Sequence, residues 1–125
     1  MNTKNTLIIG ALLAGVGVAL GAFGAHALKA SLQAAGRFDT YETAVRYQFY
    51  HALGLLLVGL LNKAHPTKKL SYASLCMLVG VMIFSGSLYL ICFTGVTMWG
   101  AVAPIGGTLL MISWGLVALG VREIV

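Results

Sequence analysis

The stretch of sequence that decides the fold is LSYASLCMLVGVMIFSGSLYLICFTGVTMWGAVAPIGGTLLMISWGLVALGV, residues 70–121, because it contains no Asp, Glu, Lys or Arg. A helix needs about 20 apolar residues to cross the hydrocarbon core of a bilayer, so this stretch is long enough for two spans. Gly95 and Pro104 supply a break between them. We therefore predict two membrane helices, over about residues 71–92 and 104–120.

Two further apolar segments lie nearer the N-terminus, and they predict membrane helices over about residues 6–28 and 40–62. In the whole chain of 125 residues, hydrophobic residues make up 59% and charged residues only 9%. A soluble domain has about 25% charged residues, so lipid must cover much of this surface. The sequence thus predicts an all-α protein, an integral membrane bundle of four transmembrane helices that forms a single domain over residues 1–125.

The first segment also resembles a secretory signal peptide, because it has a basic start and ends with Ala25-His26-Ala27. Its apolar run, Leu7 to Ala25, is longer than the roughly 7–15 residues of such a peptide. We interpret it as a retained membrane helix.

Small residues follow one face of this first helix at helical spacing. They are Gly10, Ala14, Gly17, Gly21 and Gly24. Small side chains let helices approach closely in lipid, where close packing drives association. We therefore expect Gly17, Gly21 and Gly24 to contact another helix, and the first helix to be the packed centre of the bundle. The run GVGVALG (15–21) does not have the spacing of a dinucleotide-binding loop, and no strand precedes it.

The connection to the second span predicts a short interfacial helix with Leu28 and Leu32 facing lipid. Gly36 is expected to end that helix, and Asp39 or Thr40 to cap the next one.

The second span, residues 40–62, has two different faces. The face expected to point inward carries Thr40, Ala44, Tyr47, Gln48, His51, Leu55 and Val58. The face expected to point to lipid carries Glu42, Arg46, Phe49, Leu53, Leu57 and Leu60. We expect Arg46 to reach towards the headgroups, with Glu42 one turn back as its partner.

Antiparallel threading brings most polar side chains of the spans to the outer half of the bundle. The candidate polar cluster consists of His26, Gln48, His51, Ser85 and Tyr89. A polar group without a partner in hydrocarbon costs about 2–7 kcal/mol, so these side chains should hydrogen-bond to one another. Two interpretations remain open: the histidines titrate or bind a metal or small ligand, or the cluster joins the helices structurally. Two histidines without an inward carboxylate or thiolate are a weak metal signal.

Other classes of function receive little support. The eight basic residues, which give a net charge of +5, are scattered over loops and helix ends, so no nucleic-acid partner is expected. Cys76 and Cys92 are about 24 Å apart along one helix, too far for a disulfide. Neither a catalytic constellation nor a cofactor motif is present, because the only carboxylates are Asp39, Glu42 and Glu123.

The sequence favours a non-enzymatic accessory or ligand-binding membrane protein. The alternative is a small transporter or channel-like oligomer that uses the histidines. Membrane lipid is an expected partner in either case, and a second copy or another membrane protein is a further candidate.

Several motifs along the chain resemble those of the YgdD/YwdK-like family of small bacterial inner-membrane proteins. They are GAFGAHAL (21–28), TAVRYQFYHAL (43–53), FSGSLY (84–89), PIGG (104–107) and Trp114. The resemblance implies four helices in the bacterial cytoplasmic membrane. It implies no activity, because the family is one of unknown function.

The distribution of basic residues predicts that both termini are cytoplasmic. With four spans, one side of the membrane holds Lys4, Lys63, Lys68, Lys69 and Arg122, and the other holds Lys29, Arg37 and Arg46. Basic residues are enriched on the cytoplasmic side.

Reporter fusions placed after Lys69 and at Val125 should both report cytoplasm, and a periplasmic signal from either would contradict this orientation.

Overall fold

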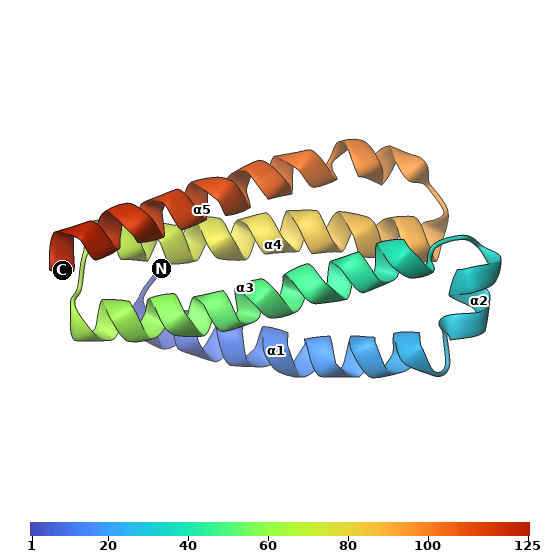
Figure 1. The fold of residues 1–125 in the computed structure, drawn as a ribbon, viewed down its shortest axis with the longest axis horizontal. Coiled ribbons are helices and arrows are strands. Elements are labelled where there is room, and N and C mark those ends of the chain that lie inside the picture. The colour runs from blue at the N-terminus through green and yellow to red at the C-terminus, as the bar shows by residue number, and fades with distance from the viewer.

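The computed structural model describes residues 1–125 and consists of helices joined by short turns (Figure 1). Its elements are α1 (Thr3–Ala25), α2 (Lys29–Ala34), α3 (Phe38–Ala64), α4 (Lys68–Thr94), the 3-10 helix η1 (Thr97–Ala101) and α5 (Ala103–Ile124). Four helices are long and apolar enough to cross a membrane: α1, α3, α4, and α5 together with η1. The predicted all-α bundle of four membrane helices is confirmed.

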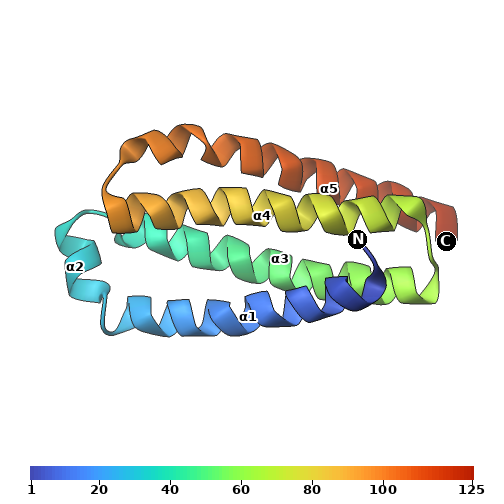
Figure 2. The same ribbon diagram turned by 180° about the vertical axis from the view of Figure 1, so that it is seen from behind.

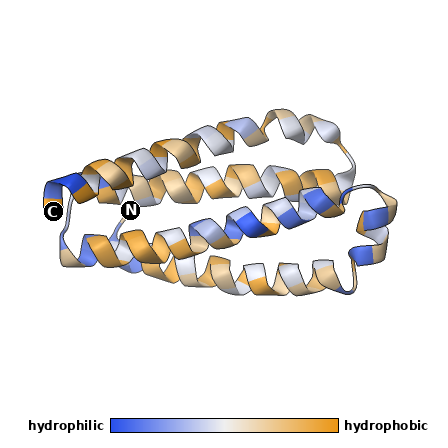
Figure 3. Cartoon of the chain, in the orientation of Figure 1, coloured by the Kyte–Doolittle hydropathy of each residue, from blue (hydrophilic) through white to orange (hydrophobic).

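Successive long helices run antiparallel, so both termini lie at one end of the bundle and α2 and η1 lie at the other (Figures 1 and 2). We call these the terminal end and the turn end. Hydrophilic residues concentrate in α2, in the first half of α3 and at the end of α5, whereas the rest of the bundle is mostly hydrophobic (Figure 3). This is the pattern of a bundle that is covered by lipid at its middle and by water at its ends.

The closest packing follows the chain, with α1 against α3, α3 against α4, and α4 against α5. The prediction that the first helix is the packed centre is wrong, because α1 buries only Thr6, Gly10, Gly17 and Gly24. A glycine face allows close approach to one neighbour but has no side chains with which to fill a core. The central positions belong to α3 and α4, which each bury nine residues. The apolar core consists of Leu55, Val58, Leu70, Ala73, Met77, Val81, Leu110 and Val117.

Glycines at seven-residue intervals set the contact between α1 and α3. A Cβ atom at Gly10 would lie 3.0 Å from the Ala52 carbonyl oxygen, and one at Gly17 would lie 2.9 Å from the Phe49 ring. At Gly24 it would lie 2.2 Å from the Tyr41 ring. Gly21, the partner of Gly17 in the predicted G-x-x-x-G pair, is looser, since its Cβ would meet only Val45, at 3.5 Å. The glycines that contact α3 most closely are therefore seven residues apart, which is about two helical turns.

The helix ends differ from the predicted bounds. The first helix ends at Ala25, because the next segment folds into α2, and Leu32 is buried at 5% exposure rather than facing lipid. Gly36 ends that segment as predicted, with φ of 68°.

The predicted caps of the second span are also wrong. The helix begins at Phe38 and receives no side-chain cap from Asp39 or Thr40. The connection from α2 is closed by backbone bonds instead, in which the Arg37 N–H donates to the Leu32 carbonyl and the Tyr41 N–H donates to that of Arg37.

The last two spans also extend beyond their predicted bounds. Thr67 caps α4 through a 3.0 Å bond from the Leu70 N–H, so α4 starts at Lys68. Pro104 lies in the first turn of α5, as predicted. The helix continues past Gly120 to Ile124, because Gly120 packs against Leu70 rather than ending the helix.

The inward face of α3 is largely as predicted, with Ala44, Gln48, His51, Leu55 and Val58 buried. Two aromatic residues change sides. Tyr47 is 39% exposed, and Phe49 is half-buried because its ring fills the space over Gly17. Glu42 and Arg46 are exposed and paired, with 3.6 Å between Oε2 and Nη2.

Substitution of Gly24 by alanine should destabilise the bundle, because the new methyl group would collide with Tyr41 and separate α1 from α3. We expect a loss of about 1–3 kcal/mol in the free energy of unfolding, the usual cost of overpacking. The measurement is the unfolding midpoint in detergent. Gly15→Ala is the matched control, because nothing lies within 4 Å of a Cβ atom at Gly15. Equal stability of the two variants would show that the α1–α3 contact is not close.

Candidate functional site

Gln48 joins three helices near the middle of the bundle. Its Nε2 donates to the Leu13 carbonyl of α1 over 2.9 Å, and its Oε1 accepts a 2.7 Å bond from the Tyr89 hydroxyl of α4. The side chain is 4% exposed. Both ends of the amide are therefore used within the protein, and within the candidate cluster Gln48 bonds to Tyr89 rather than to a histidine.

The glycines of α1 explain why backbone carbonyls accept these bonds. In a helix each Cβ leans towards the N-terminus, so the side chain at position i+4 screens the carbonyl at position i. Gly17 follows Leu13 by four residues, and Gly24 follows Leu20 by four. The Leu13 carbonyl receives Gln48, and the Leu20 carbonyl receives the hydroxyl of Tyr41, a residue that the sequence analysis did not include in the cluster. The two donors are seven residues apart on α3, as are the two glycines on α1, and this matched spacing is the signal that could have identified Tyr41.

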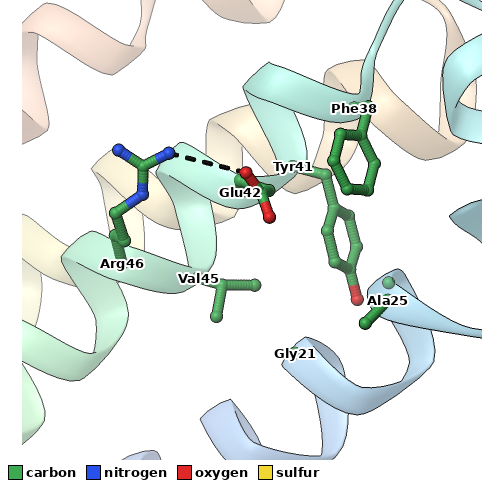
Figure 4. A pocket seen from close by; sticks show the side chains of 8 residues that line it. Gly21, Ala25, Phe38, Tyr41, Glu42, Val45 and Arg46 are labelled. Carbon is green, nitrogen blue, oxygen red and sulfur yellow. Dashed lines mark ion pairs between the residues drawn. The ribbon is translucent and has the colours of Figure 1, made fainter.

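Tyr41 reaches from α3 across to α1 and approaches Gly21 and Ala25 (Figure 4). These residues line a small cavity of about 110 Å³ at the turn end of the bundle. The Glu42–Arg46 ion pair lies at the rim of the same cavity (Figure 4). Because Tyr41 is 1% exposed and its hydroxyl is bonded to α1, this region holds the two helices together.

Serine side chains join the other neighbouring helices in the same way. Ser85 of α4 donates to the Ala44 carbonyl of α3 over 2.8 Å. Ser113 of α5, which the sequence analysis missed, donates to the Ala73 carbonyl of α4 over 2.8 Å. Each close helix pair thus contains at least one bond from a side chain to a backbone carbonyl.

His51 connects α3 with α5. Its Nδ1 lies 2.7 Å from the Tyr47 carbonyl, and its Nε2 lies 3.1 Å from Nε1 of Trp114. An indole N–H can only donate, so Nε2 of His51 must be the acceptor and the proton must be on Nδ1. The imidazole is therefore neutral, and both of its nitrogens are engaged. Trp114 was part of the family resemblance, but the sequence did not identify it as the partner of His51.

His26 is not part of the polar cluster, which corrects the prediction that it lies close to Gln48 or His51. It is exposed at the C-terminal end of α1, where it lines a shallow cavity with Ala19, Ala22 and Phe23. The Gln48 amide meets α1 at Leu13, thirteen residues before His26. At 1.5 Å per residue this is about 20 Å along the helix. Threading brings the ends of the helices to one side but does not decide which face a side chain occupies.

The other residues of the candidate polar cluster lie further from the turn end than His26 does. His51 is at the midpoint of α3, with thirteen residues before it and thirteen after it. Ser85 and Tyr89 are in the half of α4 that leads to the turn end. Every buried side-chain nitrogen and oxygen in the bundle has a hydrogen-bond partner. The cluster is thus fully bonded, and its geometry is that of interhelical joints, although Gln48, Ser85 and Tyr89 also line a cavity of about 190 Å³ between α1 and α4.

A cavity of about 350 Å³ opens between α3 and α5 beside His51. We call it the α3–α5 pocket. It is lined by Tyr47, Tyr50, His51, Phe84, Gly107, Leu110, Met111 and Trp114. Tyr50 and Met111 are 55% and 70% exposed, so the pocket faces the lipid side of the bundle.

A larger groove of about 540 Å³ lies between α1 and α4, and its lining is wholly apolar. It offers no polar group by which a ligand could be oriented. The α3–α5 pocket, which combines aromatic rings, two tyrosines and a histidine, is therefore the better candidate for a specific site.

The fold and these joints define a class of protein: a four-span helical membrane protein with a fully bonded polar interior and a lateral pocket that faces lipid. Comparison with known proteins identifies its family. Residues 20–107 match the family described as a protein of unknown function (DUF423). The chain belongs to this family, whose members are named UPF0382 membrane proteins.

Relatives match over nearly the whole chain. A UPF0382 membrane protein of Staphylococcus saprophyticus is 37% identical over 97% of this chain and 99% of its own length. The UPF0382 membrane protein YwdK of Bacillus subtilis is 39% identical over 89% of this chain and 90% of its own. The UPF0382 inner membrane protein YgdD of Escherichia coli K12 is 31% identical over 96% and 91%. No solved structure matches the chain. The family resemblance found in the sequence is confirmed.

Replacement of Gln48 by methionine should weaken the bundle, because it leaves the Tyr89 hydroxyl and the Leu13 carbonyl without their partner. We expect a loss of about 1–2 kcal/mol in the free energy of unfolding, measured in detergent or bicelles. The control is Gln33→Met, since Gln33 is exposed on α2. If both variants are as stable as the parent chain, Gln48 does not join the helices.

Proposed function

We propose that the protein is a non-enzymatic membrane protein that holds a bilayer-soluble amphiphile in the α3–α5 pocket. An amphiphile here is a molecule with an apolar tail and a small polar or aromatic head. The site would be filled from the lipid phase, since its rim faces the lipid side of the bundle.

The observation that carries the proposal is the origin of the lining residues. Four of the five motifs that carry the family resemblance contribute to the pocket, although they are spread over residues 47–114 of the chain. The contributions are Tyr47, Tyr50 and His51 from the second motif, Phe84 from the third, Gly107 from the fourth, and Trp114. A purely structural role for these motifs would not require them to meet around an opening.

The distribution of reactive groups supports binding rather than catalysis. Glu42 is paired with Arg46 and Glu123 with Lys69, and none of these residues lines the pocket. The remaining carboxylate, Asp39, is exposed near the start of α3. His51 is engaged at both nitrogens, so it is not free to act as a general base.

Charge supports a location in the cytoplasmic membrane with both termini inside the cell. The structure brings Lys4, Lys63, Lys68, Lys69 and Arg122 to the terminal end of the bundle. The turn end, by comparison, holds Lys29 and Arg37, and Arg46 lies about two turns into α3 from that end. The positive-inside rule then directs the terminal end to the cytoplasm.

The test uses the same substitution at two glycines of α5. A Cβ atom at Gly107 would make ordinary contact with Phe84 at 3.7 Å, so Gly107→Leu fills the pocket without displacing the backbone. Gly115→Leu is the control, because a Cβ there meets nothing within 4 Å. We expect an amphiphile to co-purify with the parent chain and with Gly115→Leu, and to be lost from Gly107→Leu, as measured by mass spectrometry of the detergent-solubilised proteins. Equal retention by all three, or by none, would contradict the proposal.

A further inference from the structure

The walls of the α3–α5 pocket are aromatic and nearly continuous. The centroids of Tyr47 and Phe84 are 4.7 Å apart, and those of His51 and Trp114 are 5.9 Å apart. The Tyr47 and His51 rings are stacked with only 15° between their planes. Electron-rich indole and phenol faces favour a flat, electron-poor partner, because aromatic rings attract through their quadrupoles. The shape of the pocket thus points to a planar ring.

The electrostatics of the pocket exclude a charged head. Residues 70–121, which include the α4 and α5 walls of the pocket, contain no charged residue. On α3 the nearest charges are Arg46 and Glu42, which pair with each other. An uncompensated charge at this depth is costly, so an aromatic cage for a quaternary ammonium is not the fitting interpretation. The head of the ligand must be neutral.

The remaining hydrogen-bonding capacity of the pocket is that of a donor. Both nitrogens of His51 and the indole N–H of Trp114 are already bonded. The hydroxyls of Tyr41 and Tyr89 bond within the protein, whereas those of Tyr47 and Tyr50, the two tyrosines that line the pocket, have no protein partner. Two residues that line the pocket therefore have phenolic O–H groups that are free to donate to a ligand. A ligand with carbonyl oxygens on its ring supplies acceptors for them.

From these three properties we infer that the α3–α5 pocket binds the head ring of a lipid-soluble quinone. A quinone ring is planar, neutral and electron-poor, and it carries two carbonyl acceptors, while its apolar tail remains in the bilayer. The inference rests on the proposed function and names the class of amphiphile. It concerns binding alone and requires no electron transfer by the protein.

Trp114 provides the readout, because quinones quench indole fluorescence at short range. The chain has two tryptophans, so Trp99→Phe leaves Trp114 as the sole indole. This protein is placed in nanodiscs of phosphatidylethanolamine and phosphatidylglycerol and titrated with decylubiquinone. The matched probe is decyl-2,5-dimethoxybenzene, which has the same length of tail and a ring without carbonyls.

We expect quenching of the parent protein by decylubiquinone to saturate. The decylubiquinone concentration at half-saturation should rise about tenfold or more in Gly107→Leu and stay unchanged in Gly115→Leu. Tyr50→Phe, which keeps the ring and removes the donor, should weaken binding by about threefold to tenfold. The tyrosine variant keeps the test valid if Gly107→Leu fails to fold. Quenching that rises linearly with probe per lipid and is equal in all variants would overturn the inference.

The retention experiment separates the two levels of the proposal. If an amphiphile co-purifies and is displaced by Gly107→Leu while decylubiquinone does not quench saturably, the quinone assignment is wrong and the pocket holds another molecule, such as a phospholipid chain. If neither retention nor saturable quenching is found, the proposed function fails as well. The binding of the dimethoxybenzene is read as recovery of fluorescence when it displaces decylubiquinone, and displacement at equal concentration would show that the carbonyl groups are not recognised.

Discussion

The hydrogen bond from the Gln48 amide to the Leu13 carbonyl shows the constraint on which the rest of the structure depends. In hydrocarbon, water does not satisfy polar groups, so each must find a partner inside the protein. Glycine at position 17 uncovers the carbonyl four residues earlier, and glycine at position 24 does the same for Tyr41. Close packing and hydrogen bonding between α1 and α3 thus have the same cause, because the lack of a side chain at glycine allows both.

Interhelical hydrogen bonds also fix the position of the proposed site. Gln48 and Tyr41 hold α3 against α1, and Ser85 holds it against α4. His51, which lies on the same inward face of α3 about 60° around the helix from Gln48, then meets α5 through its bond with Trp114. The α3–α5 pocket is lined by the rings around this bond. An interior in which all polar groups are already bonded therefore leaves the lipid-facing side as the place for a ligand.

The sequence predicted the fold well because the signals are additive along the chain. The uncharged stretch before Arg122 predicts two helices regardless of how they pack, and Pro104 and Gly36 act locally through their own backbone preferences. The inward face of α3 was also recovered from periodicity. The central helix was not predicted correctly, because α1 has small residues on two faces. Small residues allow close packing without requiring it.

The candidate site was harder to predict, because its bonds depend on rotation of one helix against another. Gln48 and Tyr89 were placed in one cluster because both lie on inward faces, but the bond between them was not predicted. His26 was misplaced, because its position at a helix end fixed its depth but not its direction. Trp114 and Ser113 were missed as bonding partners, because on a helix without charged neighbours neither depth nor spacing distinguishes a bonded indole or hydroxyl from one that faces lipid.

The tautomer of His51 reports whether α3 and α5 are joined as described, because its two nitrogens bond to different helices. Of the three histidines in the chain, His26 and His65 can be replaced by glutamine, so that nitrogen-15 NMR in lipid bilayers observes His51 alone. The geometry of the two bonds predicts a neutral ring with its proton on Nδ1, bonded to the Tyr47 carbonyl, and an unprotonated Nε2 that accepts from Trp114. A ring protonated on Nε2 or on both nitrogens would contradict it.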